Sequence, residues 1–269
     1  MKVVTFTNVK GGVGKTTCSD LTALYIIMMR RTPVVVIDLD PQCGSSVLFL
    51  KGKDHERSIK TALDMVLEGE DPSEIMTNPY PVEGRENLFI IPSHSRLTET
   101  ANHCPVNLLR LILESTEYGD DVTVIIDTGT GDNLVAMGLA AADGVVVPMM
   151  LSKQCARPTT KTLNWISAHQ KTLLGILPVA SAQAKWENVI LEKMTELLET
   201  HKGFKAMGAS LLPRIPYSRS VVRGEWVTGT FPEIIIPSID AVYTKIFGES
   251  AIVQEEPLAI SKEESANVA

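Results

Sequence analysis

Hydrophobic positions along the chain follow two alternating spacings. Continuous apolar runs, typical of strands that are covered on both faces, occupy residues 3–6, 34–37, 87–93, 141–149 and 173–179, and another such run ends at Asp127. Between these runs, apolar residues recur every three or four positions, which predicts helices over residues 16–29, 59–67, 106–117, 159–170 and 186–200. Strands that alternate with helices predict an α/β fold, in which helices flank a doubly wound, mostly parallel sheet.

A glycine-rich loop, KGGVGKTT, directly follows the first apolar run and leads into the first helix. Such a turn directs several backbone N–H groups and the positive end of the helix toward one spot, which suits a phosphate group. Lys15 would reach the outer phosphates, and the Thr16 hydroxyl would ligate Mg²⁺. The expected nucleotide-binding residues of this loop are Lys10, Gly11, Gly12, Val13, Gly14, Lys15, Thr16 and Thr17.

Lys10 makes this loop a deviant version of the P-loop pattern. The usual pattern has a glycine where this chain has Val9, and here a lysine follows that position. A cation before the loop is badly placed for its own phosphates, but it would reach the nucleotide of a second subunit if two loops faced each other. Lys10 would then act in trans, as an arginine finger does.

Aspartates follow two further apolar runs at the points where the strands end. Asp38 and Asp40 come after residues 34–37, and Asp127 ends its own strand. Ligands of parallel sheets gather beyond the carboxyl ends of the strands, so we expect Thr16, Asp38 and Asp127 to form the metal site. Asp40 is expected to position the attacking water, which makes Lys10, Lys15 and Asp40 the candidate catalytic residues. A single acid after a strand is commonly a turn former, but three matched segments favour a nucleotide site.

These motifs make the chain resemble the ParA/MinD superfamily of deviant-Walker ATPases, most closely the short ParA-type partition ATPases without an N-terminal DNA-binding domain. The resemblance spans most of residues 1–248 and rests on KGGVGKTT, DLDPQ followed by CGSS, the IID strand and AADGVVVPM. It implies that Lys10 is the signature lysine and that loss of Asp40 traps the ATP state. It also implies an ATP-sandwich homodimer that binds non-specific DNA until a ParB-like or other adaptor protein stimulates hydrolysis.

Two segments depart from the family pattern. After the IID strand, relatives carry a proline pair, whereas this chain has TGTG at residues 128–131, which predicts a more flexible loop. Near the C-terminal end, Pro213 and Arg214 match the family's pair and are expected to contact the nucleotide, but IPYSRSVVRGEW follows them. The adenine-side wall and the DNA-binding face are therefore expected to be rebuilt.

Charge is distributed unevenly over the chain, whose net charge of −7 argues against a general nucleic-acid binder. Residues 249–269 are acidic, and we expect them to form a disordered tail beyond an ATPase domain of residues 1–248. Residues 201–224 contain lysines and arginines but no acid. Lys205, Arg219 and Arg223 are the candidate DNA-binding residues; the alternatives are a solvated basic loop or arginines that contact the nucleotide.

Length and hydropathy favour one domain in the cytoplasm. The chain has 269 residues, of which 44% are hydrophobic, enough for one large core. No apolar stretch approaches the roughly 20 residues that span a bilayer. We therefore expect a cytoplasmic, nucleoid-associated protein with no membrane partner, which uses ATP and Mg²⁺ to position a plasmid, a chromosome or a protein assembly.

Other function classes remain as alternatives. A P-loop metabolic enzyme would keep the same nucleotide chemistry and add a small-molecule site near residues 128–131 and 214–226. A MinD-like positioning ATPase would end in a basic amphipathic helix, but the C-terminal segment is acidic and contains Pro257. An iron–sulfur reductase would need cysteines after Asp127, and that loop has none.

Overall fold

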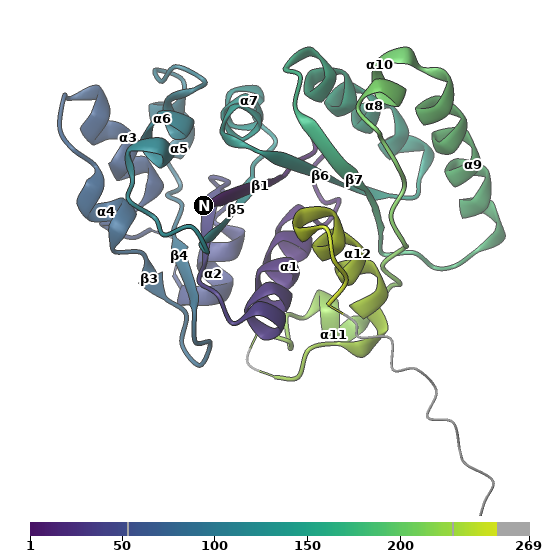
Figure 1. Cartoon of the computed structure of the whole chain (residues 1–269), viewed down its shortest axis with the longest axis horizontal. Helices are drawn as coiled ribbons and strands as arrows, with labels where there is room; N and C mark the ends of the chain where they lie inside the picture. The colour runs from purple at the N-terminus through teal and green to yellow at the C-terminus, as the bar shows by residue number, and fades with distance from the viewer. Residues whose placement is uncertain (53, 228, 252–269) are drawn as a thin grey trace, which may run out of the picture.

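The computed structural model describes residues 1–52, 54–227 and 229–251. Its centre is a seven-stranded sheet with the order β3-β4-β2-β5-β1-β6-β7 (Figure 1). All neighbouring strands are parallel except β3 and β4 at one edge, which are antiparallel. The strands are β1 Lys2–Phe6, β2 Val34–Leu39, β3 Tyr80–Pro81, β4 Leu88–Ile91, β5 Thr123–Thr128, β6 Gly144–Met150 and β7 Thr172–Val179. The predicted α/β fold with a mostly parallel sheet is confirmed.

Helices cover both faces of this sheet (Figure 1). On one face lie α1 (Lys15–Arg30), α2 (Gly44–Leu50), α11 (Arg219–Val222) and α12 (Ile236–Phe247). The other face is covered by α3 (Ile59–Leu67), α5 (Leu97–Ala101), α6 (Leu108–Ser115), α7 (Asp132–Ala141), α8 (Lys153–Ala168), α9 (Lys185–Thr200) and α10 (Lys202–Ala206). The short α4 (Ser73–Thr77) packs on α3, and the 3₁₀ helix η1 (Glu233–Ile235) precedes α12.

The central strands are buried on both faces because successive side chains point to opposite sides of a sheet. Val4 and Val36 belong to the hydrophobic cluster under α1 and α12. Their neighbours Val3 and Val35 belong to the cluster under α3 and α6. This two-sided burial explains why the sequence shows continuous apolar runs at these strands instead of an alternating pattern.

Strand order places the motifs of the sequence side by side. In the parallel register, Phe6 of β1 pairs with Asp127 of β5, and Asp127 pairs with Asp38 of β2. The loop after β1 therefore lies beside both aspartates at the carboxyl ends of three adjacent strands. This is the edge at which parallel sheets bind ligands.

Several element boundaries differ from the predictions. The predicted strand 141–149 begins at Gly144, because the residues before it end α7, a helix that the sequence pattern did not reveal. The predicted helix 159–170 begins at Lys153 as α8 and contains Pro158. Proline lacks an N–H donor and usually marks a helix break, so the sequence pattern predicts a later start than the helix has.

The segment between α10 and α11 covers the outer edge of β7. Ile176 donates its N–H to the Ser210 carbonyl at 2.9 Å and accepts from Leu212 N–H at 2.8 Å. Farther along, the N–H of Ile215 donates to the Pro178 carbonyl at 2.8 Å. These bonds give the edge strand a backbone partner at Ile176 and Pro178, in its second half.

The predicted tail, residues 249–269, lies almost wholly outside the described residues, so its disorder stays a prediction. Among the described residues, no helix combines the length and the apolarity needed to cross a bilayer.

Candidate nucleotide and metal site

The glycine-rich loop between β1 and α1 contains two residues in the left-handed region. Gly12 has φ 71° and Gly14 has φ 81°, angles that favour glycine. Gly14 immediately precedes α1, and a Cβ atom there would lie 3.4 Å from the side chain of Val179. The first N–H groups of the 16-residue helix α1 therefore face the loop, as a phosphate site requires.

Asn8, which sequence reasoning missed, fixes the start of this loop. Its fully buried amide donates to the Pro148 carbonyl at 2.9 Å and to Thr159 Oγ1 at 3.1 Å. Its Oδ1 accepts from the backbone N–H of Lys10 at 3.0 Å. Thr159 belongs to α8, so this network ties the loop to that helix. These partners are too far along the chain for a local pattern to reveal them.

Lys15 lies inside the loop and is almost completely buried. Its side chain is 6% exposed, and its Nζ donates to the Lys10 carbonyl at 3.4 Å. Burial lowers the pKa of this ammonium group, while the charges of Asp127 and Asp40 oppose that shift. A buried cation at the start of α1, where the first N–H groups have no partner within the helix, is suited to hold the charge of a phosphate.

Lys10 differs from Lys15 in its surroundings. It is half-buried at the start of the loop, and its ammonium group has no hydrogen bond or ion pair within residues 1–52, 54–227 and 229–251. Within the described residues, only the backbone of Lys10 is bound, and its carbonyl accepts a hydrogen bond from Lys15 Nζ. The ammonium group of Lys10 is therefore available to a group outside the described chain.

Thr16 and Asp127 form the core of the candidate metal site. The Thr16 hydroxyl donates to Asp127 Oδ2 at 2.6 Å. Asp127 is fully buried, and its Oδ1 has no hydrogen-bond partner in the described part of the chain. Burial, followed by the charge of Asp38, raises the pKa of Asp127 well above its usual range. A buried oxygen without a donor and a hydroxyl beside it suit Mg²⁺ with its water shell, so the residues present fit this ion.

Asp38 lies beside this pair but uses both of its oxygens within the protein. Oδ2 accepts from the N–H of Ser46 at 2.8 Å and from its hydroxyl at 2.6 Å, and Oδ1 accepts from the N–H of Asp40 at 3.1 Å. Burial raises the pKa of Asp38 to about 6 despite these bonds. Asp38 thus holds the start of α2 and the residue Asp40 in place, and its part in the metal site stays a prediction.

Asp40 reaches into a cavity of about 790 Å³ that adjoins the loop. Its Oδ1 accepts from the N–H of Gln42 at 3.0 Å. A Cβ atom at Gly129 would lie 3.2 Å from this same Oδ1, so the chain passes very close here. The remaining lining comes from Gly11, Gly12, Gly14, Lys15, Thr16, Thr17, Pro41, Gln42, Thr98, Thr130, Gly131 and Leu134. The cavity therefore joins the phosphate loop to Asp40 and to the loop after β5.

A second cavity, of about 370 Å³, adjoins the same loop and is mainly apolar. Val13 and Thr17 line it together with Ile215, Pro216 and Tyr217. Pro213 and Arg214, the residues expected to contact the nucleotide, do not line it. The guanidinium group of Arg214 instead contacts the start of α9, at Asn188 Oδ1 (3.3 Å) and Glu187 Oε2 (3.8 Å).

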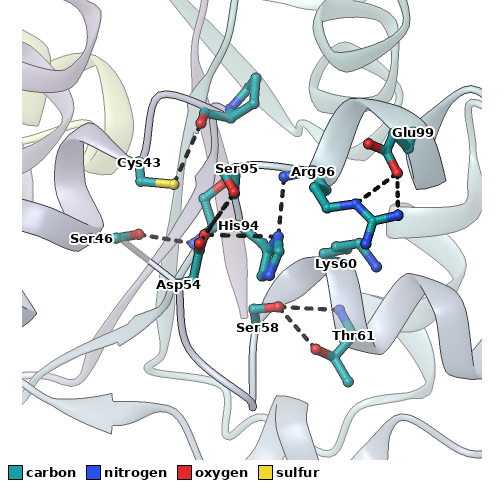
Figure 2. Close-up of polar contacts among 12 residues, drawn as sticks. Cys43, Ser46, Asp54, Ser58, Lys60, Thr61, His94, Ser95, Arg96 and Glu99 are labelled. Atoms are coloured by element: carbon teal, nitrogen blue, oxygen red, sulfur yellow. Dashed lines mark hydrogen bonds and ion pairs between the residues drawn. The ribbon is translucent and has the colours of Figure 1, made fainter. Parts of the chain in front are cut away.

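A polar network fixes the segment that leads to one wall of the larger cavity, the wall formed by Thr98 of α5. The sequence pattern did not reveal this network. Figure 2 shows Asp54 and Ser95 directed toward one another, and Asp54 accepts from the Ser95 N–H at 2.8 Å and from its hydroxyl at 3.2 Å. These bonds lower the pKa of Asp54. Beside it, the N–H of Ser93 donates to Ser46 Oγ at 2.9 Å. The connection between β4 and α5 is thus fixed, and α5 carries Thr98 to the cavity.

The three candidate DNA-binding residues do not form one surface. Lys205 lies on α10, which packs against α8 and α9, whereas Arg219 and Arg223 belong to α11 or follow it directly. Figure 1 places α10 and α11 at opposite sides of the molecule. Arg223 is also paired with Glu225 at 3.6 Å. The basic stretch of the sequence therefore divides into two separate groups.

Comparison with known proteins identifies the family. The sequence profile of a family described as an AAA domain matches residues 1–177. The chain belongs to this family. It is similar to the chromosome-partitioning ATPase Soj of Thermus thermophilus, with 27% identity over 214 residues, which are 78% of this chain and 80% of that protein. The predicted resemblance to the ParA/MinD superfamily is confirmed.

Solved structures of other proteins share the fold of this AAA-domain chain. The complex of McdA from Cyanothece with ATP has a TM-score of 0.75 and 19% identity, and the match covers 94% of this chain and 99% of McdA. Cobyrinic acid a,c-diamide synthase of Mycobacterium smegmatis, with bound ADP and magnesium, has a TM-score of 0.65 and 23% identity, over 84% of this chain and 92% of the synthase. At these identities, the likeness establishes the fold.

Proposed function

We propose that this chain is an ATP-switched partition ATPase, which dimerises around ATP, binds non-specific DNA in that state and is reset by hydrolysis. The observation that carries the proposal is Lys10, whose charge has no partner within the described residues although it stands at the start of the phosphate loop. The coarser part, that the chain is an ATPase, agrees with its family and with the similar ATPase Soj. ATP and Mg²⁺ are the proposed cofactors, and solved structures that share the fold hold ATP or ADP with magnesium.

The chemistry follows from the positions of four side chains. Lys15 would neutralise the charge that develops on the transferred phosphoryl group, and Lys10 of a second subunit would do so from the opposite side. Thr16 and Asp127 would hold Mg²⁺, which when bound neutralises phosphate oxygens. Asp40 lies in the cavity next to the loop and would orient the attacking water.

The apolar cavity is a suitable place for the base of the nucleotide. It adjoins Gly12 and Gly14 and is walled by Ile215, Pro216 and Tyr217. Flat apolar walls next to a phosphate site suit a purine ring. We therefore assign base contacts to residues 215–217 in place of Pro213 and Arg214.

Arg219 and Arg223 are the proposed contacts to DNA phosphates. Arg219 directly follows Ser218, which lines the apolar cavity, so nucleotide binding and this basic group lie close together. This proximity supports a DNA affinity that depends on the bound nucleotide. An adaptor protein, ParB-like or of another type, would stimulate hydrolysis and release the DNA, and the protein would be associated with the nucleoid.

Dimerisation can be tested with variants that separate hydrolysis from assembly. Asp40→Ala should bind ATP, hydrolyse it slowly and form a stable dimer in size-exclusion chromatography with light scattering. Asp40→Ala combined with Lys10→Ala should stay monomeric at the same ATP concentration, because the contact in trans is lost. An Asp40→Ala variant that hydrolyses ATP normally, or a double variant that dimerises equally well, would contradict these roles.

An ATP-using enzyme with a small-molecule substrate is the alternative. It is favoured by the cavity of about 790 Å³, which continues beyond the phosphate loop to Thr98 and Thr130. ATP hydrolysis that responds to DNA together with a protein activator would support the partition function. Hydrolysis that responds to a small acid or amide, and not to DNA, would support the enzyme.

A further inference from the structure

Asp20 is a fully buried acid on α1 that the nucleotide motif does not explain. It lies four residues after Thr16 and therefore on the same face of the helix, one turn farther along. Its Oδ1 accepts from the Ser45 hydroxyl at 2.8 Å. Its Oδ2 is buried and has no hydrogen-bond partner in the part of the chain that the structure describes. Such an oxygen is costly to bury, which points to a role other than stability.

Ser45 connects Asp20 to the candidate metal site. The Ser45 Oγ atom is 2.8 Å from Asp20 Oδ1 and 3.4 Å from Asp127 Oδ2. A serine hydroxyl has a single proton, and the shorter contact receives it. Asp127 Oδ2 then keeps Thr16, at 2.6 Å, as its close donor.

We propose that Asp20 is a positioning residue of the Mg²⁺ site, where it holds the Ser45 proton away from Asp127. The Asp127 carboxylate thereby stays open to the metal and its water shell. Without an acceptor at position 20, the Ser45 hydroxyl would turn to Asp127, which is the other carboxylate within its reach, and would compete with the metal. The inference rests on the proposed function in one respect, because it needs a Mg²⁺–nucleotide site at Thr16 and Asp127.

Stability separates this role from a merely structural one. Asp20 buries one carboxylate oxygen without a partner among the described residues, which costs free energy, so an apolar side chain of similar shape should not lower the stability of the protein. We therefore expect Asp20→Leu to melt at or above the temperature of the natural chain while it binds Mg²⁺ more weakly. A purely structural Asp20 would give the opposite pair of results, a lower melting temperature and an unchanged metal affinity.

The test is a titration of Mg²⁺ into the full chain in the presence of a slowly hydrolysed ATP analogue, and the heat of binding is measured by calorimetry. Asp20→Leu should raise the dissociation constant for Mg²⁺ about tenfold, as loss of supporting contacts at metal sites does. Asp20→Asn, whose amide oxygen can still accept from Ser45, should bind Mg²⁺ like the natural chain. Asp20→Leu combined with Ser45→Ala should regain the affinity, because the competing hydroxyl is gone.

Two outcomes would overturn the proposal. In the first, Asp20→Leu binds Mg²⁺ as tightly as the natural chain. In the second, Asp20→Leu combined with Ser45→Ala loses as much Mg²⁺ affinity as Asp20→Leu alone. If Asp20→Leu does not fold, Asp20→Ala with and without Ser45→Ala gives the same comparison. A natural chain whose nucleotide binding does not depend on Mg²⁺ would contradict the proposed function itself. If nucleotide binding by the natural chain depends on Mg²⁺ but the variants bind Mg²⁺ with unchanged affinity, only the role of Asp20 is contradicted.

Discussion

Asp38 shows at the scale of one residue how burial and hydrogen bonding compete at the site. Three donors surround its carboxylate and favour the charged form, but complete burial disfavours it more strongly. The result is a pKa of about 6, above the usual value of 3.8. The folded chain therefore retains a proton on Asp38 in a pH range where the unfolded chain has already lost it.

A pH dependence of stability follows from this difference. Between about pH 4 and pH 6 the folded state binds more protons than the unfolded state, so the free energy of unfolding should fall as pH rises, by about 3 kcal/mol in total. In Asp38→Asn this contribution is absent. Urea unfolding without nucleotide or Mg²⁺ across this range should give a flatter pH dependence for the variant. Parallel curves for the two proteins would show that Asp38 does not titrate there.

At the scale of elements, the conformation of the loop after β5 is fixed by its close approach to the residues that follow β2. The sequence pattern TGTG predicts flexibility, but Gly129 donates its N–H to the Leu39 carbonyl at 3.0 Å. A Cβ atom at this position would lie 3.2 Å from both Asp40 Oδ1 and Pro41 Cδ. Glycine is needed here because the loop after β5 touches the residue that is proposed to orient water.

Gly129→Ala should lower the rate of ATP hydrolysis about tenfold, because a displaced catalytic group costs rate steeply, while nucleotide affinity is retained. Gly131→Ala is the matched control, since its Cβ would lie at an ordinary distance of 3.7 Å from Leu134. Single-turnover hydrolysis and nucleotide binding would be measured for both variants. Equal rates in the two variants would contradict the proposed contact between the loop and Asp40.

Local motifs explain which parts of the site could be predicted. The phosphate loop, Asp127 and Asp40 follow from short patterns at strand ends, and the strand order that joins them is typical of this fold. The supporting residues Asn8 and Asp20 could not be found this way. Their partners lie on α8 and α2, and only the folded chain brings these groups together. For the same reason, the sequence pattern points to Pro213 and Arg214 for the base-side wall, whereas the apolar cavity is lined by Ile215, Pro216 and Tyr217.

At the scale of the whole molecule, the distribution of basic residues matters more than the net charge. The stretch that reads as one basic segment in the sequence is divided by the fold, which separates α10 from α11 (Figure 1). Of these two groups, only the one at α11 adjoins the apolar cavity that is proposed to hold the base. A nucleotide-dependent DNA contact is therefore expected at Arg219 and Arg223, and not at Lys205.

Binding to a random-sequence DNA duplex tests this division. With ATP, the natural chain should bind at low salt and more weakly at moderate salt. Arg219→Ala combined with Arg223→Ala should remove most of this affinity and reduce its dependence on salt, whereas Lys205→Ala should bind like the natural chain. If the natural chain binds no DNA in any nucleotide state, the partition function is excluded. If only Lys205→Ala loses affinity, the DNA-binding surface lies at α10 and not at α11.

The covered edge of β7 has a consequence for solubility. The family profile ends at residue 177, close to the end of this strand, but the backbone that pairs with the strand comes later, around Ser210 and Ile215. A chain shortened to the matched region would expose a row of unpaired amide and carbonyl groups on an apolar strand, which is a template for aggregation. The last third of the chain therefore protects the sheet from self-association.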